Sequence, residues 1–234
     1  MSEQKLGVLG GMGPQATQVF YQFVLDRTDA LKDQDHLPTV LLSDTHIPDR
    51  TQAILSGETE GIYQWLLKDA RLLEGCGCTT IVLPCNTSHY FVDRLQGEVS
   101  VPIIHMIREA ASALAAQGKK RPGILATEGT IRSGLYQKEC AALGMEPYVP
   151  EEEIQRLVTS IIYDEIKQGE KGSRDKFAHI DRALRKAGCD CAILACTELS
   201  VFATYHPLPP FYLDAMMVLA EQAVIRCGYP LRTI

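Results

Sequence analysis

The chain has 234 residues, of which 46% are hydrophobic and 22% charged, as in a globular protein with one large domain or two small ones. The formal net charge is -6 at pH 7 and the basic residues form no runs, which excludes nucleic acid and anionic membranes as expected partners. No apolar run approaches the length of a membrane span, and residues 1–5 lack the pattern of a signal peptide. We therefore expect a cytoplasmic protein, in which the eight cysteines serve as reactive thiols or metal ligands more readily than as disulfides.

Short β-type runs alternate with longer helical patterns along the chain, and this alternation predicts the α/β class. The predicted buried parallel strands are Leu6–Leu9, Val40–Ser43, Thr80–Leu83, Ile103–His105, Gly123–Leu125 and Ala192–Leu194. The 3.6-residue periodicity predicts helices at Thr17–Leu25, Gly61–Leu73, Ile107–Ala116, Ile154–Ile162, Lys176–Ala187 and Leu213–Ile225.

Two stretches of the first half recur in the second half in the same order. Leu6–Gly13 is similar to Pro122–Gly129, and each is a strand that runs into a turn of small residues. Gly77–Thr87 is similar to Gly188–Glu198, and nearly the same length of chain separates the members of both pairs. The repeat predicts two similar α/β halves with parallel sheets.

We place the first domain at residues 1–99 and the second at residues 100–210. Ligands of open parallel sheets bind outside the carboxyl ends of the strands. Two similar halves that face each other also form a cleft between them. We therefore expect the active site in this cleft.

Cys85 and Cys196 occupy equivalent places in the repeat, each separated by one residue from the end of a predicted strand. The repeat thus predicts that two thiols approach one ligand from opposite sides. Moving a hydrogen from one face of a carbon to the other needs a base on one face and an acid on the other. A thiolate and a thiol can coexist near neutral pH and exchange these two roles.

Short polar residues follow both cysteines, Asn86-Thr87-Ser88 in the first half and Thr197-Glu198 in the second. Such residues could cap a following helix whose first N–H groups face the cleft. Donors in that position would stabilise a carboxylate that becomes enolate-like as the α-proton leaves. The hydroxyls of Thr87 and Thr197 could add hydrogen bonds.

The other cysteines have plainer interpretations. A buried cysteine often serves as a small hydrophobic residue, which fits Cys78, Cys140, Cys191 and Cys227.

Metal binding is not expected. Cys76-x-Cys78, Cys189-x-Cys191 and the pair Cys85 and His89 all lack the usual zinc spacing. A thioredoxin-like role is excluded because the chain has no Cys-x-x-Cys. We interpret His89 and His105 as structural residues or as residues that support the site, and not as catalytic residues.

The turn Gly10-Gly11-Met12-Gly13 lacks the Gly-x-Gly-x-x-Gly spacing of dinucleotide-binding proteins, and Pro14 follows it at a helix start. We interpret it as a tight turn that faces a ligand. Taken alone, Arg50 and Lys167 would be surface charges.

Five motifs and one lysine carry a resemblance to a known family. In chain order they are Gly10-Gly11-Met12-Gly13-Pro14, Ile47-Pro48-Asp49-Arg50-Thr51, Leu83-Pro84-Cys85-Asn86-Thr87, Ala126-Thr127-Glu128-Gly129-Thr130, Lys167, and Ala195-Cys196-Thr197-Glu198-Leu199. Together they resemble the aspartate/glutamate racemase superfamily, most closely its cofactor-independent aspartate racemase branch. The resemblance spans the whole chain. It implies two pseudo-symmetric α/β domains, with the C-terminal helix within residues 211–234 returning to the first, and a homodimer. It also implies no pyridoxal phosphate and no metal.

The resemblance implies a role for each matching residue. Cys85 and Cys196 would be the proton donor and acceptor. The α-amino and α-carboxylate groups would be held by Met12, Asn86, Thr87, Thr127 and Thr197. Arg50 and Lys167 would take the side-chain carboxylate, in keeping with the need of an acidic substrate for cations.

The retained Cys85 and Arg50 favour aspartate, interconverted in both directions. Some relatives with broader or one-sided activity replace the first cysteine by threonine or the arginine by a neutral residue. A racemase for glutamate or for acidic amino acids in general is the alternative within the same class. Outside it, the chain could be a non-catalytic protein that binds a small dicarboxylate, although two matched thiols argue against this.

Overall fold

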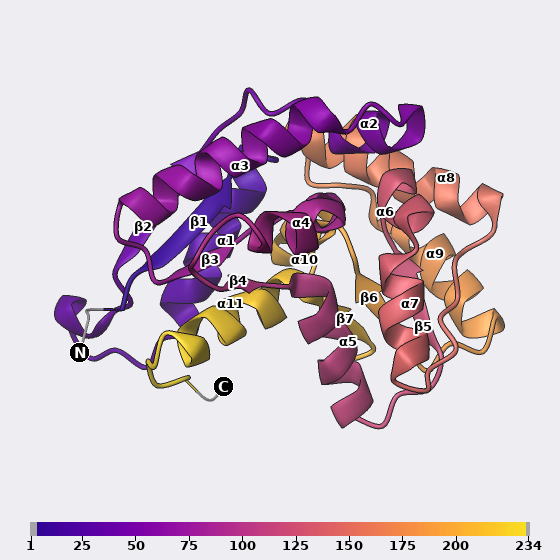
Figure 1. Cartoon of the computed structure of the whole chain (residues 1–234). Helices are drawn as coiled ribbons and strands as arrows, with labels where there is room; N and C mark the ends of the chain where they lie inside the picture. Colours follow the sequence, from indigo (N-terminus) through magenta and orange to yellow (C-terminus); the bar gives the residue numbers. More distant parts are fainter. Residues whose placement is uncertain (1–3, 233–234) are drawn as a thin grey trace. The chain divides into compact units, whose positions relative to one another are not determined.

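The computed structural model describes residues 4–232 of the chain (Figure 1). Its strands are β1 (Leu6–Gly10), β2 (Thr39–Ser43), β3 (Thr80–Val82), β4 (Ile103–Ile104), β5 (Pro122–Leu125), β6 (Cys191–Leu194) and β7 (Tyr212–Asp214). Its α-helices are α1 (Pro14–Arg27), α2 (Arg50–Ser56), α3 (Glu60–Gly75), α4 (Val92–Gln96), α5 (Met106–Ala116), α6 (Glu128–Ser133), α7 (Leu135–Ala142), α8 (Glu152–Ser160), α9 (Arg174–Lys186), α10 (Thr197–Tyr205) and α11 (Ala215–Arg226).

The strands form two separate parallel sheets, in the orders β2-β1-β3-β4 and β5-β6-β7. In the first sheet β1 pairs with both β2 and β3, and in the second β6 pairs with both β5 and β7. Every residue of β1, β3, β5 and β6 is buried, as expected for parallel sheets whose two faces are covered. These sheets confirm the predicted α/β fold with two parallel sheets.

The chain divides into two compact units. One contains the residues up to Met106 together with those from Met216 onward, and the other contains Ile107–Ala215. The chain leaves the first unit just after β4 and returns to it just after β7, so α11 belongs to the first unit. The domain boundaries after residues 99 and 210 stay a prediction, since compact units within one chain need not be domains that fold alone.

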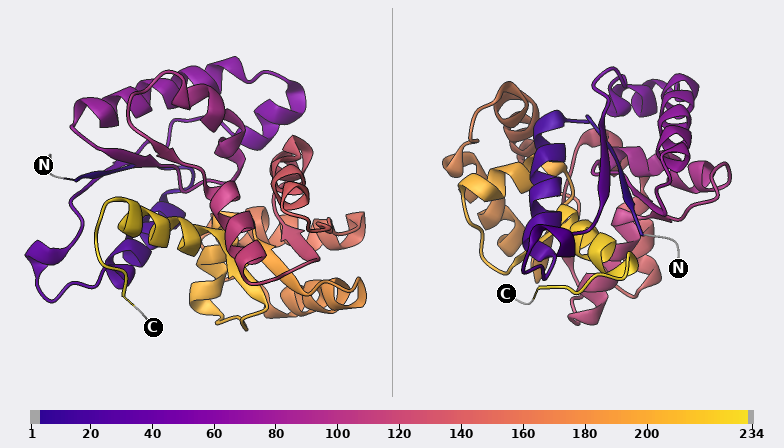
Figure 2. Two further views of the ribbon diagram at one scale, coloured as in Figure 1. Left: turned by 60° about the horizontal axis from the view of Figure 1, so that its bottom comes forward. Right: turned by 90° about the vertical axis from the view of Figure 1, so that its left-hand side faces the viewer.

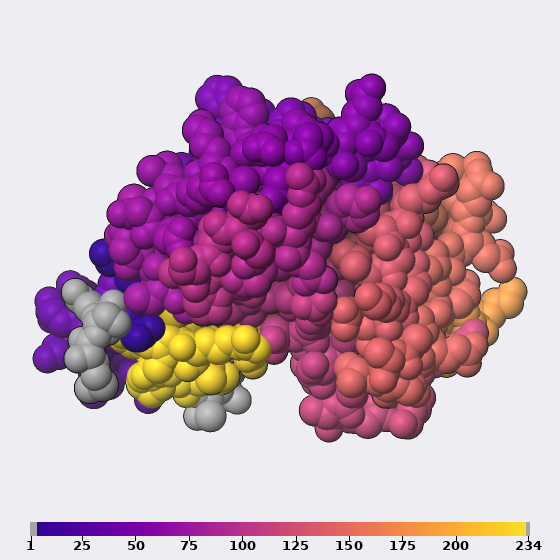
Figure 3. All heavy atoms as spheres, in the orientation of Figure 1, coloured from indigo at the N-terminus to yellow at the C-terminus, as the bar shows by residue number. Residues whose placement is uncertain are grey.

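Helices cover both faces of the sheet in the first unit. Helix α3 lies on one face, and α1 and α11 lie on the other (Figure 2). Helix α3 buries Ile62, Leu66, Ala70 and Leu73, which recur every three or four residues and form one apolar stripe. The space-filling view shows α11 as the yellow surface next to the indigo and purple atoms of the same unit (Figure 3).

The second unit packs its helices closely on a shorter sheet. Helix α9 buries Phe177, Ile180 and Leu184. A Cβ atom added to Gly123 in β5 would lie 2.6 Å from a methyl carbon of Leu184. A larger residue at position 123 would therefore require the Leu184 side chain or α9 itself to shift.

The structure corrects the predicted start of the last helix. Tyr212–Asp214 form β7, which pairs with β6, and the helix begins at Ala215 instead of Leu213. A strand of three residues is too short for a clear period of two, and Leu213 also fits the helical spacing of α11. The helices α2, α4, α6 and α7, which were not predicted, have five to eight residues and are too short for a reliable 3.6-residue pattern. Helix α10 was expected only as a helix that follows Cys196, and its consecutive buried residues Thr197–Phe202 leave no such pattern.

Within residues 4–232, no helix combines the length and the apolar character that a membrane span requires.

Candidate active site

The turn after β1 has a fixed shape. Gly11 has a φ of 91°, and a Cβ atom added to it would lie 2.3 Å from the carbonyl oxygen of Asp44. The Thr17 hydroxyl accepts the N–H of Gly11 at 2.9 Å and donates to the carbonyl of Gly13 at 2.9 Å. Only glycine fits at position 11 without strain, and the turn is held from within by one threonine.

Arg50 lies beside this turn as the first residue of α2, whose N-terminus is capped by the side chain of Asp49. One guanidinium nitrogen donates to the Met12 carbonyl at 3.0 Å. Another nitrogen donates to the Pro48 carbonyl at 2.9 Å. The planar fork of the arginine therefore links the α2 loop to the glycine turn.

Met12 connects the turn with the segment that follows β3. Its side chain is buried, and its sulfur accepts a hydrogen bond from the Ser88 hydroxyl at 3.1 Å. Ser88 belongs to a 3₁₀ turn, Thr87–Phe91, that begins two residues after Cys85. The first unit thus brings Met12 and Arg50 together with the segment that carries Cys85, Asn86 and Thr87, at the carboxyl ends of β1 and β3.

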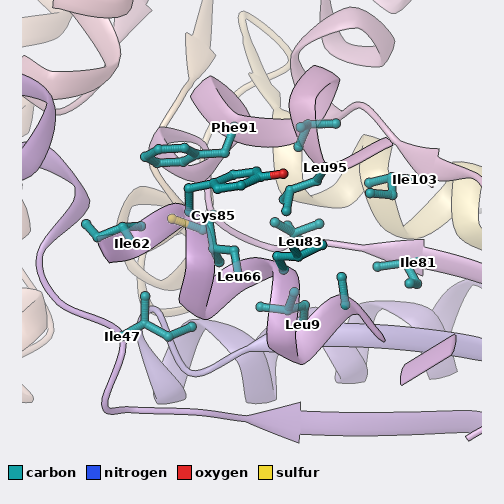
Figure 4. Packing of buried hydrophobic residues seen from close by; sticks show 14 of the residues in the cluster. Leu9, Ile47, Ile62, Leu66, Ile81, Leu83, Cys85, Phe91, Leu95 and Ile103 are labelled. Carbon is teal, nitrogen blue, oxygen red and sulfur yellow. The ribbon is translucent and has the colours of Figure 1, made fainter. Parts of the chain in front are cut away.

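Cys85 lies between β3 and this 3₁₀ turn and is buried. It belongs to a hydrophobic cluster, in which Ile62 and Leu66 of α3 lie close by (Figure 4). Asn86 and Thr87, which follow it, are also buried.

The ring of His89 fixes the backbone at Cys85. Its Nε2 accepts the backbone N–H of Met106 at 2.9 Å, so Nδ1 carries the proton and donates to the Cys85 carbonyl at 2.9 Å. The ring of His105 meets it edge to face at 4.9 Å between centroids. Both histidine rings therefore make contacts that hold the backbone and each other in the first unit.

In the second unit, Cys196 lies between β6 and the first residue of α10. Its thiol donates to Oε2 of Glu198 at 2.9 Å, and the backbone N–H of Glu198 hydrogen-bonds the sulfur. Burial and the Glu198 carboxylate raise the pKa of the Cys196 thiol well above its ordinary value, whereas Lys167 opposes this shift. Cys196 therefore holds its proton at neutral pH.

Lys167 forms an ion pair with the buried carboxylate of Glu198. Lys167 lies in a 3₁₀ turn, Ile166–Gln168, which follows a π-helical turn over Ile161–Glu165. Irregular helical turns of this kind often occur at functional sites. That Lys167 holds the carboxylate of a substrate stays a prediction, because its partner in the structure is a residue of the chain.

Thr127 and Thr197 lie after the neighbouring strands β5 and β6. Thr127 is buried and caps α6 by accepting the N–H of Thr130 at 3.3 Å. The hydroxyl of Thr197 donates to Oε2 of Glu198 at 3.4 Å. Cys196, Thr197 and Lys167 therefore meet at one carboxylate, that of Glu198.

From the sequence alone, Glu198 is only a candidate helix cap. Its spacing of two residues from Cys196 was the available signal, but the sequence could not show that its carboxylate turns back to the sulfur. Among the described residues, no group of three or more His, Cys, Asp or Glu side chains is arranged to hold a metal ion. That Cys85 and Cys196 face one substrate stays a prediction.

Comparison with known proteins connects these motifs with one family. Residues 9–223 match the family model described as Asp/Glu/Hydantoin racemase. The broad specificity amino-acid racemase RacX of Bacillus subtilis (strain 168) is 31% identical over 170 residues, covering 67% of this chain and 69% of that protein. The glutamate racemase of Limosilactobacillus reuteri (strain DSM 20016) is 28% identical over 143 residues, which span about half of that protein, 52%.

A solved structure is similar over nearly the whole chain. The Picrophilus torridus aspartate racemase superimposes with a TM-score of 0.82 and is 28% identical in sequence. The match covers 98% of this chain and 96% of that one.

Proposed function

Because the chain belongs to the Asp/Glu/hydantoin racemase family, we propose that it interconverts L- and D-aspartate without a cofactor. Cys85 and Cys196 exchange the α-proton from opposite faces of the α-carbon. One thiolate removes the proton from one face while the other thiol delivers a proton to the opposite face. We propose that the enzyme acts as a homodimer.

The observation that carries this proposal is the equivalent place of the two cysteines. Cys85 follows β3, which pairs with β1, and Cys196 follows β6, which pairs with β5 in the same parallel sense. A ligand-binding protein needs donors and cations in its site but has no need of a thiol at both of these strand ends. Two equivalent thiols are what a racemisation in both directions requires.

The protonation of Cys196 indicates which thiol acts as the acid for one of the two enantiomers. Because Cys196 holds its proton at neutral pH, it is the acid when a substrate first presents its α-proton to Cys85. For the other enantiomer Cys196 must first lose that proton. Glu198 accepts the hydrogen bond of the thiol and is placed to receive it.

The residues after each cysteine would stabilise the carbanion. Removal of the α-proton moves negative charge onto the α-carboxylate, and pre-oriented N–H and hydroxyl donors stabilise such charge. We assign this role to the backbone at the start of α10 and to Asn86, Thr87, Thr127 and Thr197. Met12, whose carbonyl accepts from Arg50 and whose sulfur accepts from Ser88, would help to hold the α-amino and α-carboxylate groups.

The choice of aspartate rests on two cations and on one relative. Arg50 and Lys167 match the side-chain carboxylate of an acidic amino acid. The aspartate racemase of Picrophilus torridus is similar in structure over almost the whole chain. The similarity to broad specificity RacX and to a glutamate racemase keeps other substrates as the alternative, since one methylene is discriminated only modestly.

A racemisation assay over both enantiomers of aspartate, glutamate and alanine tests the proposal. We expect the wild-type protein to racemise aspartate fastest and in both directions. Cys85→Ser and Cys196→Ser should each lose at least about 10²-fold in rate, whereas Cys76→Ser, at an exposed cysteine, should not. Aspartate binding without racemisation would favour a binding protein, and full activity of Cys85→Ser or Cys196→Ser would contradict the two-thiol mechanism.

A further inference from the structure

One proton and one negative charge are shared at Glu198. Its Oε2 accepts the hydrogen bond of the Cys196 thiol at 2.9 Å, and its Oε1 pairs with the ammonium of Lys167. The Glu198 side chain is only 6% exposed, so both partners act on it in a poorly solvated environment. Charges in such an environment interact more strongly than at the surface.

The cation decides where the negative charge lies. Lys167 stabilises negative charge on both groups, but its ammonium contacts the carboxylate directly, so it stabilises charge on Glu198 more than charge on the sulfur of Cys196. While the ion pair is formed, the proton stays on the thiol. Without the ion pair, the ammonium no longer holds the negative charge at Oε1, and the proton that the thiol shares with Glu198 can move to Oε2.

We propose that the side-chain carboxylate of the substrate activates Cys196 by drawing Lys167 away from Glu198. This inference rests on the proposed function and deepens it. The N–H donors of Lys167 turn from Oε1 to the substrate carboxylate. The S–H bond of Cys196 then breaks, an O–H bond forms at Oε2 of Glu198, and the electron pair remains on sulfur as a thiolate that can take the α-proton.

The side chain of Lys167 is partly open to solvent. Its side chain is 26% exposed, and the 3₁₀ turn that carries it ends at Gly169, with a φ of 86°. Its ammonium lies 5.5 Å from the centroid of the Tyr163 ring, and the face of such a ring attracts cations.

A second lysine–glutamate pair of the same unit differs from the first in the partner of the second carboxylate oxygen. Lys176 pairs with Glu165, whose other oxygen accepts the backbone N–H of Ser173 at 2.6 Å. Both oxygens of Glu165 therefore have structural partners, one a lysine and the other a backbone group. In Glu198 the corresponding second partner is a thiol that can lose its proton. This makes Lys176 a matched control for Lys167.

By this mechanism, part of the selectivity between substrates arises in kcat and not only in the affinity for the substrate. Alanine has no side-chain carboxylate, so it cannot compete with Glu198 for Lys167 and leaves Cys196 protonated. We expect Lys167→Gln to lower the ratio of kcat for aspartate to kcat for alanine by at least about tenfold. Lys176→Gln should leave this ratio unchanged.

The direct test uses succinate, a dicarboxylate that has no α-amino group and cannot be racemised. In a Cys85→Ser background, succinate should raise the ultraviolet absorbance of a thiolate, and propionate, with one carboxylate, should not. The response should vanish in Glu198→Gln, Lys167→Gln and Cys196→Ser. It should remain in Lys176→Gln, which would show that the loss is not a general effect of removing a lysine.

The outcomes separate this inference from the proposed function. If the wild-type protein fails to racemise aspartate but succinate still produces the thiolate, the function fails and the switch stands. The switch is overturned if the wild-type protein racemises aspartate while succinate leaves the thiolate absorbance unchanged. A full succinate response in Glu198→Gln, with Cys196 as its source, would also overturn it.

Discussion

The guanidinium of Arg50 donates a hydrogen bond to the backbone carbonyl of Met12, 3.0 Å away. A second nitrogen of the same group reaches the Pro48 carbonyl at 2.9 Å. Arg50 therefore shapes the glycine turn, whatever contact it also makes with a substrate. The compact ammonium of a lysine cannot reproduce this planar fork.

We predict that Arg50→Lys lowers kcat/KM for aspartate by about 10- to 100-fold, because hydrogen bonds from charged groups contribute about 1.5–3 kcal/mol each. Steady-state kinetics measure the effect. Arg71→Lys, at an exposed ion pair with Glu98, is the control and should behave as the wild type. Unchanged kinetics of Arg50→Lys would show that the fork has no role in the site.

Gly11 and Gly57 form a matched pair for a second prediction. Both have a positive φ, 91° and 82°, but an added Cβ meets the Asp44 backbone at 2.3 Å only at Gly11, and at Gly57 it meets nothing within 4 Å. Gly57→Ala should cost about 1 kcal/mol in the free energy of unfolding, from backbone strain alone. Gly11→Ala adds a backbone collision and should cost at least about 2 kcal/mol and most of the activity.

Denaturant titration and the racemisation assay measure both variants. Equal losses of stability in the two would show that the collision with Asp44 is relieved at no cost. Wild-type activity of Gly11→Ala would separate the glycine turn from the site.

Asp69 should make the free energy of unfolding depend on pH. It is buried on α3, and burial together with the neighbouring Asp44 raises its pKa from 3.8 to about 6. Between these two values the folded state binds more protons than the unfolded state, so the free energy of unfolding falls as the pH rises. The full effect amounts to about 3 kcal/mol above pH 6.

Asp69→Asn removes this titration while keeping the size of the side chain. We expect the variant to be more stable than the wild type at pH 8, with a difference that decreases steadily as the pH falls toward 4. Denaturant titrations across this range measure the difference, and the exposed Glu58→Gln serves as control. A stability difference that does not vary with pH would contradict the raised pKa.

The sequence predicted best what depends on local pattern. The inner strands that precede Cys85 and Cys196 are continuous apolar runs, so their ends and the two thiols could be located. Strand β7 has three residues, and only its pairing with β6 makes it a strand. Such pairing depends on distant parts of the chain and leaves no local periodicity.

The hydrogen-bond and ion-pair partners of the charged residues could not be predicted from the sequence for a similar reason. Lys167 and Glu198 are 31 residues apart, and Arg50 and Met12 are 38 apart. Nothing in either segment indicates its partner, since any carboxylate or carbonyl satisfies a cation. The resemblance to a family assigned both cations to a substrate, and the structure shows that each also holds a group of the protein.

The central claim is that two thiols transfer the α-proton, and the position of deuterium at early times tests it most directly. L-aspartate is incubated with the wild-type protein in deuterated water, and both enantiomers are analysed by mass before equilibrium. We expect the D-aspartate formed to carry deuterium at the α-carbon and the remaining L-aspartate to keep its protium, because the delivering thiol exchanges with solvent. Deuterium that appears equally fast in the recovered L-aspartate, or D-aspartate that retains the original proton, would contradict the account.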